Sequence, residues 1–122
     1  MSKANIYQQI NTSMNVETAS PHQLTSMLFE HAIKNTSVAK SAISVENHEL
    51  KSVSIDKAIA IVAELQNSLI DIETNEIAAN LNGLYDFVIK ELVVANLKSS
   101  EYTLDRIVSI LLELKKGWEA IA

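Results

Sequence analysis

Residues 76–87 read EIAANLNGLYDF, and Ala95-Asn96-Leu97 follow on the same uninterrupted segment. Within this segment apolar residues recur at intervals of three and four, at Ile77, Leu81, Leu84, Val88, Leu92 and Ala95. That spacing places them on one face of an α-helix. The segment therefore predicts a helix with a continuous apolar face, which must be buried against another element.

The segments on either side repeat this pattern. A second helix is predicted between the polar residues 46–49 and a break at residues 71–76, with apolar residues at Ile55, Ala58, Val62, Leu65, Leu69 and Ile72. A last helix is predicted after Ser99 and Ser100, which are suitable N-caps. Its apolar residues are Leu104, Ile107, Val108, Leu111, Leu114, Trp118 and Ile121.

A first helix is predicted to begin at Ser20 and Pro21. The serine oxygen can accept from the free amides of the first turn, proline is tolerated at the first helical position, and Gln23 completes a capping box. Two apolar stripes follow, so this helix can contact two neighbours. One stripe is Leu24, Met27, Leu28, Val38 and Ala42, and the other is Phe29, Ala32, Ile33, Ala39 and Ile43.

Four predicted helices with short connections favour one architecture, in which successive helices lie antiparallel. The composition agrees, because the 122 residues include only two glycines and one proline while 48% are apolar. We therefore predict an all-α protein, an antiparallel four-helix bundle over residues 20–122. Residues 1–19 lack a helical or strand period and predict a flexible N-terminal arm, whose Ile6, Tyr7 and Ile10 are available for docking.

Composition and charge exclude several classes of function. The net charge of −5 disfavours nucleic acid as a partner, and the lack of cysteine excludes disulfides and thiolate chemistry. Residues 1–14 have no apolar core typical of a secretory leader, and the longest apolar run, residues 58–63, is far shorter than a membrane span. We expect a cytoplasmic protein without a membrane span.

The residue patterns predict neither an enzyme nor a cofactor protein. His22, His31 and His48 each lack a glutamate three residues earlier, so the Glu-x-x-His pairs of di-metal bundles are absent. Two glycines, Gly83 and Gly117, cannot form a glycine-rich phosphate loop. We therefore expect no catalytic residue, no metal and no cofactor.

The order of several short motifs along nearly the whole chain resembles the FliS family of flagellar secretion chaperones. The resemblance begins at Tyr7-Gln8-Gln9 in the arm and includes Met27-Leu28-Phe29-Glu30 in the first helix. It continues through Glu76-Ile77-Ala78, Leu84-Tyr85-Asp86-Phe87, Ala95-Asn96, Leu112-Glu113-Leu114 and Trp118. The resemblance implies a bundle that binds the C-terminal segment of flagellin, prevents its premature polymerisation and assists its export through the flagellar export gate.

The resemblance also implies an N-terminal arm able to cover the binding groove, and helical exchange that would give a homodimer. Physically, the implied mode is recognition of a disordered amphipathic segment in grooves between helices. Candidate groove residues lie on the last three predicted helices. Each apolar candidate and Tyr85 can equally be a core residue, and Asn80 and Asn96 can either bind a partner backbone or fix an inter-helix contact. They are Ile61, Leu65, Leu69, Ile72, Asn80, Leu81, Leu84, Tyr85, Asp86, Val88, Asn96 and Leu111.

A second function fits the same periodicity. A helical adaptor or regulatory protein could use its apolar stripes for self-association, with no flagellin client. The two functions differ in the partner that they require: a chaperone binds an isolated flagellin C-terminal peptide, whereas an adaptor shows a mass that rises with concentration.

Overall fold

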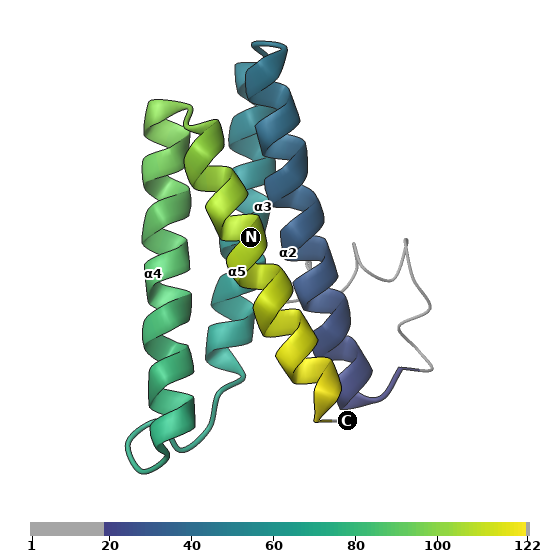
Figure 1. Ribbon diagram of the computed structural model, residues 1–122, viewed down its shortest axis with the longest axis vertical. Coiled ribbons are helices and arrows are strands. Elements are labelled where there is room, and N and C mark those ends of the chain that lie inside the picture. The colour runs from purple at the N-terminus through teal and green to yellow at the C-terminus, as the bar shows by residue number, and fades with distance from the viewer. Residues whose placement is uncertain (1–18, 122) are drawn as a thin grey trace.

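The computed structural model describes residues 19–121, which form four helices and no strand. The helices are α2 (Pro21–Ser44), α3 (His48–Asn67), α4 (Glu76–Lys98) and α5 (Glu101–Ala120). Successive helices run in opposite directions along one long axis (Figure 1). The predicted antiparallel four-helix bundle is confirmed. Most of the predicted arm, with Ile6, Tyr7 and Ile10, lies outside the described residues.

Side chains define the start of each helix. Ser20 Oγ accepts from the Gln23 amide at 3.1 Å while the Gln23 side chain accepts from the Ser20 amide at 2.8 Å, so the predicted capping box is confirmed. Ser100 is the N-cap of α5, as predicted. Asn47 and Asn75 cap α3 and α4. These caps satisfy amides that have no partner within the helix.

The second helix is shorter than predicted. It ends at Asn67, so Leu69 and Ile72 lie in the connection to α4 and the prediction that they continue the helix is wrong. Two local features explain the stop. The Ser68 hydroxyl donates to the Leu65 carbonyl at 2.7 Å, which competes with the helical hydrogen bond, and Asp71 adopts a left-handed backbone with φ of 57°.

The core follows the predicted stripes along the middle of all four helices. As predicted from its two stripes, α2 contacts both α3 and α5, and α4 packs on α3. The contact between α4 and α5 is the least extensive of these. The buried core residues are Leu28, Phe29, Ala32, Ala39, Ile55, Ala58, Ile61, Val62, Leu65, Tyr85, Val88, Leu92, Ala95, Leu104, Ile107 and Leu111.

Figure 1 shows that α4 and α5 meet near Ser100, at the top of the view, and diverge downward as α5 crosses toward α2. We call the lower end the base of the bundle. It contains the start of α2, the end of α5 and the connection between α3 and α4. The divergence leaves apolar side chains of α4 and α5 incompletely covered toward the base.

At the opposite end of the bundle, a buried lysine joins α3 to α4. Lys51, on the first turn of α3, is 7% exposed, and its ammonium donates to the Asn96 carbonyl and to Ser99 Oγ, each at 2.9 Å. The carbonyl groups at the end of a helix lack helical partners and carry partial negative charge. Lys51 therefore caps α4 and joins it to α3.

Replacing Lys51 with methionine is expected to lower the free energy of unfolding by about 2 kcal/mol, because the change removes two charge-assisted hydrogen bonds and a helix-end charge interaction. Chemical denaturation followed by circular dichroism measures this. The control is Lys90→Met, because Lys90 is exposed and forms an ion pair with the exposed Asp86 one turn away. Equal losses in the two variants would contradict a capping role for Lys51.

Candidate binding groove

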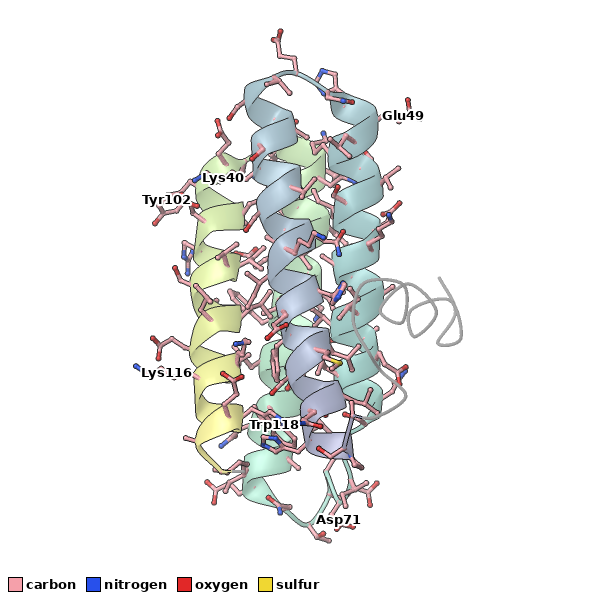
Figure 2. The ribbon with its side chains drawn as sticks, turned by 90° about the vertical axis from the view of Figure 1, so that its right-hand side faces the viewer. Lys40, Glu49, Asp71, Tyr102, Lys116 and Trp118 are labelled. Atoms are coloured by element: carbon pink, nitrogen blue, oxygen red, sulfur yellow. The ribbon has the colours of Figure 1, made fainter. Side chains whose placement is uncertain are left out.

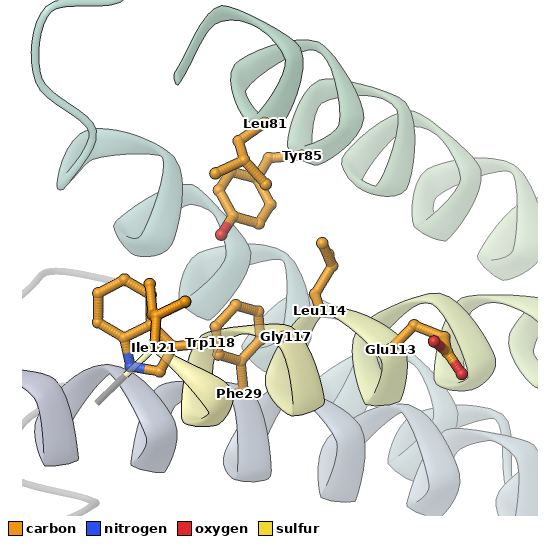
Figure 3. A pocket seen from close by; sticks show the side chains of 8 residues that line it. All are labelled: Phe29, Leu81, Tyr85, Glu113, Leu114, Gly117, Trp118 and Ile121. Carbon is orange, nitrogen blue, oxygen red and sulfur yellow. The ribbon is translucent and has the colours of Figure 1, made fainter. Parts of the chain in front are cut away.

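The first cavity lies between the diverging halves of α4 and α5 and has a volume of about 220 Å³. Figure 3 shows Leu81 and Tyr85 projecting from α4 toward the α5 side chains, with Phe29 below them on α2. Glu113 lies at the edge, away from the aromatic rings. We call this cavity the middle pocket. It is lined by Phe29, Leu81, Tyr85, Glu113, Leu114, Gly117, Trp118 and Ile121.

Two further cavities adjoin the middle pocket. The base pocket, of about 410 Å³, shares Leu81, Tyr85 and Trp118 with it. The upper pocket, of about 370 Å³, shares Glu113 and Leu114 with it and adds Leu84, Ser109 and Ile110. The remaining residues that line the base pocket are Thr25, Leu65, Ser68, Leu69, Ile70, Asn75, Ile77 and Ala78.

Neighbouring pockets share lining residues and together form one groove. Its upper and middle parts lie between α4 and α5, and its base extends to α3 and the α3–α4 connection. We call it the α4–α5 groove. Its lining is mainly aliphatic and aromatic, with few polar groups, which is the composition of surfaces that bind apolar side chains. The groove exists because a straight α4 cannot follow α5 as it crosses toward α2.

Trp118 stands where the middle and base pockets meet, and it is held there by His22 on the first turn of α2. The two rings stack with centroids 4.7 Å apart and an interplanar angle of 14°. Trp118 Nε1 donates to the His22 carbonyl at 3.0 Å, and His22 Nε2 lies 2.9 Å from the Trp118 carbonyl. Figure 2 shows Trp118 at the base, above Asp71 in the α3–α4 connection.

Tyr85 contributes a polar atom to a mainly apolar wall. Its ring lies 6.5 Å from that of Phe29, with the two planes tilted by 43°. Burial raises the pKa of Tyr85 to about 12, because the protein interior disfavours the phenolate. The hydroxyl therefore remains protonated at neutral pH and can both donate and accept a hydrogen bond.

The structure distributes the predicted groove residues over three environments. Leu69, Leu81 and Leu84 are partly exposed and line the groove. Tyr85 and Leu65 are buried but form part of its wall. Ile61, Val88 and Leu111 are buried in the core, and none of them lines the three pockets.

The polar candidates and Ile72 lie outside the three pockets. Ile72, Asn80 and Asp86 are exposed, and Asp86 pairs with Lys90 at 3.1 Å. Asn96 forms an inter-helix contact, because its side-chain oxygen accepts from Ser52 Oγ at 3.2 Å. This contact joins α4 to α3.

Several groove residues were not among the predicted candidates. Phe29, Leu114 and Trp118 belong to the predicted stripes, and stripe membership alone does not separate a core side chain from one that lines a groove. Ile70 lies in a connection, where periodicity provides no signal. The others on α4, on α5 or at the C-cap of α5 are Ile77, Ala78, Ser109, Ile110, Glu113, Gly117 and Ile121.

Other chemistry has no support in the part of the chain that the structure describes. Within residues 19–121 no three His, Cys, Asp or Glu side chains gather as a metal site would require. None of the four described helices has the length and apolarity needed to cross a bilayer. A helical bundle with an open apolar groove has the architecture of a module that binds polypeptides.

Comparison with known proteins identifies the class of this module. The family model described as flagellar protein FliS matches residues 3–122. The chain is 34% identical over 116 residues to the flagellar secretion chaperone FliSB of Pseudomonas aeruginosa, which covers 95% of this chain and 92% of that protein. It is 31% identical to the flagellar secretion chaperone FliS of Vibrio cholerae, over 94% of this chain and 85% of that one.

The flagellar secretion chaperone FliS of Salmonella typhimurium is 32% identical over 119 residues, which is 95% of this chain and 87% of the relative. The chain belongs to the FliS family. This family consists of chaperones and not enzymes, which confirms the prediction that the protein is non-catalytic.

Proposed function

We propose that this chain is a cytosolic export chaperone that binds the disordered C-terminal segment of flagellin in the α4–α5 groove. Binding there prevents premature polymerisation and assists delivery to the flagellar type III export gate. The observation that carries the proposal is the continuous apolar groove in a chain of the FliS family. The flagellin client is the one that the family resemblance implies.

The shape of the groove suits a segment that folds as it binds. Partly exposed Leu81, Leu84 and Leu114 present apolar surface along a line, which is how grooves recognise an amphipathic helix. Ordering a disordered segment costs about 2–5 kcal/mol of the gross interaction. Because the groove is open before binding, the bundle needs little rearrangement. The free-energy cost of ordering therefore comes mainly from the client segment.

Calorimetry with full-length flagellin, flagellin without its C-terminal segment, and the isolated C-terminal peptide tests the proposal. We expect deletion of the segment to weaken binding by at least about 100-fold, and the isolated peptide to retain most of the binding free energy. Equal affinity for full-length and truncated flagellin would overturn the proposed client segment.

The alternative function, a self-associating adaptor, predicts a different result in the same samples. Light scattering would then show a mass that rises with protein concentration, and calorimetry would detect no peptide binding. A homodimer that still binds the peptide would be compatible with the chaperone function, because the groove is built from helices of one chain.

A further inference from the structure

The pair of His22 and Trp118 joins two chain segments that are far apart in sequence. Each ring contacts the backbone of the other residue: the indole donates to the His22 carbonyl, and the imidazole contacts the Trp118 carbonyl. A carbonyl oxygen can only accept, so His22 Nε2 is the protonated nitrogen in this contact. The two contacts and the ring stack form a reciprocal clasp between α2 and α5.

The clasp acts where α5 is intrinsically weakest. Trp118 lies in the last turn, whose carbonyl groups lack helical partners, and this turn contains no basic residue that could cap them. From the C-cap of α5, the Ile121 amide also donates to the Trp118 carbonyl, at the longer distance of 3.3 Å. His22 therefore supplies the shorter hydrogen bond and a flat surface for the indole.

Trp118 is also the side chain that, with Leu81 and Tyr85, belongs to both the middle and the base pocket. Rotation of its indole would therefore change the shape of both pockets. We propose that His22 is a positioning residue of the binding site, which holds the Trp118 indole in the lining that the two pockets share. The proposal deepens the proposed function and rests on it for the identity of the ligand, a flagellin C-terminal peptide.

Trp118 is the only tryptophan of the chain, so intrinsic fluorescence reports directly on its environment. Two substitutions separate the parts of the clasp. His22→Phe keeps a flat ring against the indole and removes the Nε2 donor, whereas His22→Ala removes both. For His22→Ala we expect red-shifted emission from the free protein and peptide affinity lowered about 10-fold, with an intermediate result for His22→Phe.

Lys51→Met is the matched control, because it removes hydrogen bonds at the opposite end of the bundle. It should lower the midpoint of thermal unfolding while leaving the emission and the affinity of the folded protein unchanged. If His22→Ala and His22→Phe also leave emission and affinity unchanged, or if Lys51→Met weakens binding equally, a positioning role for His22 is overturned.

The design keeps this inference separate from the proposed function. If the wild-type protein binds no flagellin peptide, the proposed client is wrong, and a hydrophobic dye that fluoresces in apolar pockets replaces the peptide as probe. His22→Ala must then shift the emission of Trp118 and change dye affinity several-fold relative to Lys51→Met. In that case, an emission and a dye affinity of His22→Ala that match those of Lys51→Met would overturn the inference.

Discussion

Replacing Leu81 with glutamate is expected to lower the affinity for a flagellin C-terminal peptide by about 100-fold, or about 2.7 kcal/mol, in a bundle that remains folded. Leu81 is partly exposed in the free protein and lines both the middle and the base pocket. A carboxylate there is tolerated while water reaches it. Once a client covers the groove, the charge is buried without a partner.

Val93→Glu is the matched control for Leu81→Glu. Val93 lies on the same helix, is 45% exposed and does not line any of the three pockets. Both variants add one negative charge, so a general electrostatic effect would weaken both equally. Calorimetry should find near-wild-type affinity for Val93→Glu. An equal loss in the two variants would show that added charge, and not a lost groove contact, weakens binding, and near-wild-type affinity of Leu81→Glu would place the client elsewhere.

Replacing Leu111 with alanine is expected to lower the free energy of unfolding by about 3 kcal/mol. Leu111 has no exposed surface and packs among core residues of the other helices, so truncation leaves a cavity. The sequence alone allowed Leu111 to be a groove residue. A core role predicts that the folded fraction of Leu111→Ala binds the peptide as the wild type does.

The neighbouring residue provides the comparison. Leu112 is 50% exposed, and Leu112→Ala should change the stability by less than about 0.5 kcal/mol. Denaturant titration of both variants, followed by calorimetry under conditions in which each is folded, separates stability from binding. A reduced peptide affinity of folded Leu111→Ala with unchanged stability would show that Leu111 contacts the client.

The helices of this chain follow from local rules. Periodic apolar residues and capping side chains such as Ser20 and Ser100 specify where α2 and α5 begin, because both effects depend on neighbours in sequence. The end of α3 was harder to predict. Leu69 and Ile72 continue the apolar spacing beyond Ser68, and nothing in the periodicity shows that Ser68 and Asp71 favour a turn.

The groove was only partly predictable, for a geometric reason. A stripe identifies the face of a helix that is buried, but the crossing angle between helices decides how far along its length that burial extends. Leu111 and Leu114 belong to the same stripe of α5. Leu111 has no exposed surface, whereas Leu114, one turn later, is partly exposed and lines the middle and upper pockets.

The same limitation explains why the contact of Trp118 with His22 could not be predicted from the sequence. The place of Trp118 in the last stripe was predicted, but its partner His22 is 96 positions away in sequence and follows no periodicity that links the two. The contact of His22 with the indole depends on α5 crossing toward α2, and that path is a property of the whole bundle.

The contrast between the two ends of the molecule has a consequence for its motions. At one end of the bundle the Lys51 ammonium joins α3 to the end of α4, whereas toward the other end α4 and α5 diverge, and their contact is the least extensive of the packed pairs described above. Local opening in proteins begins where the fewest contacts must break. We therefore expect α4 and α5 to separate first toward the base, so that a client segment can enter there while the end near Lys51 keeps its structure.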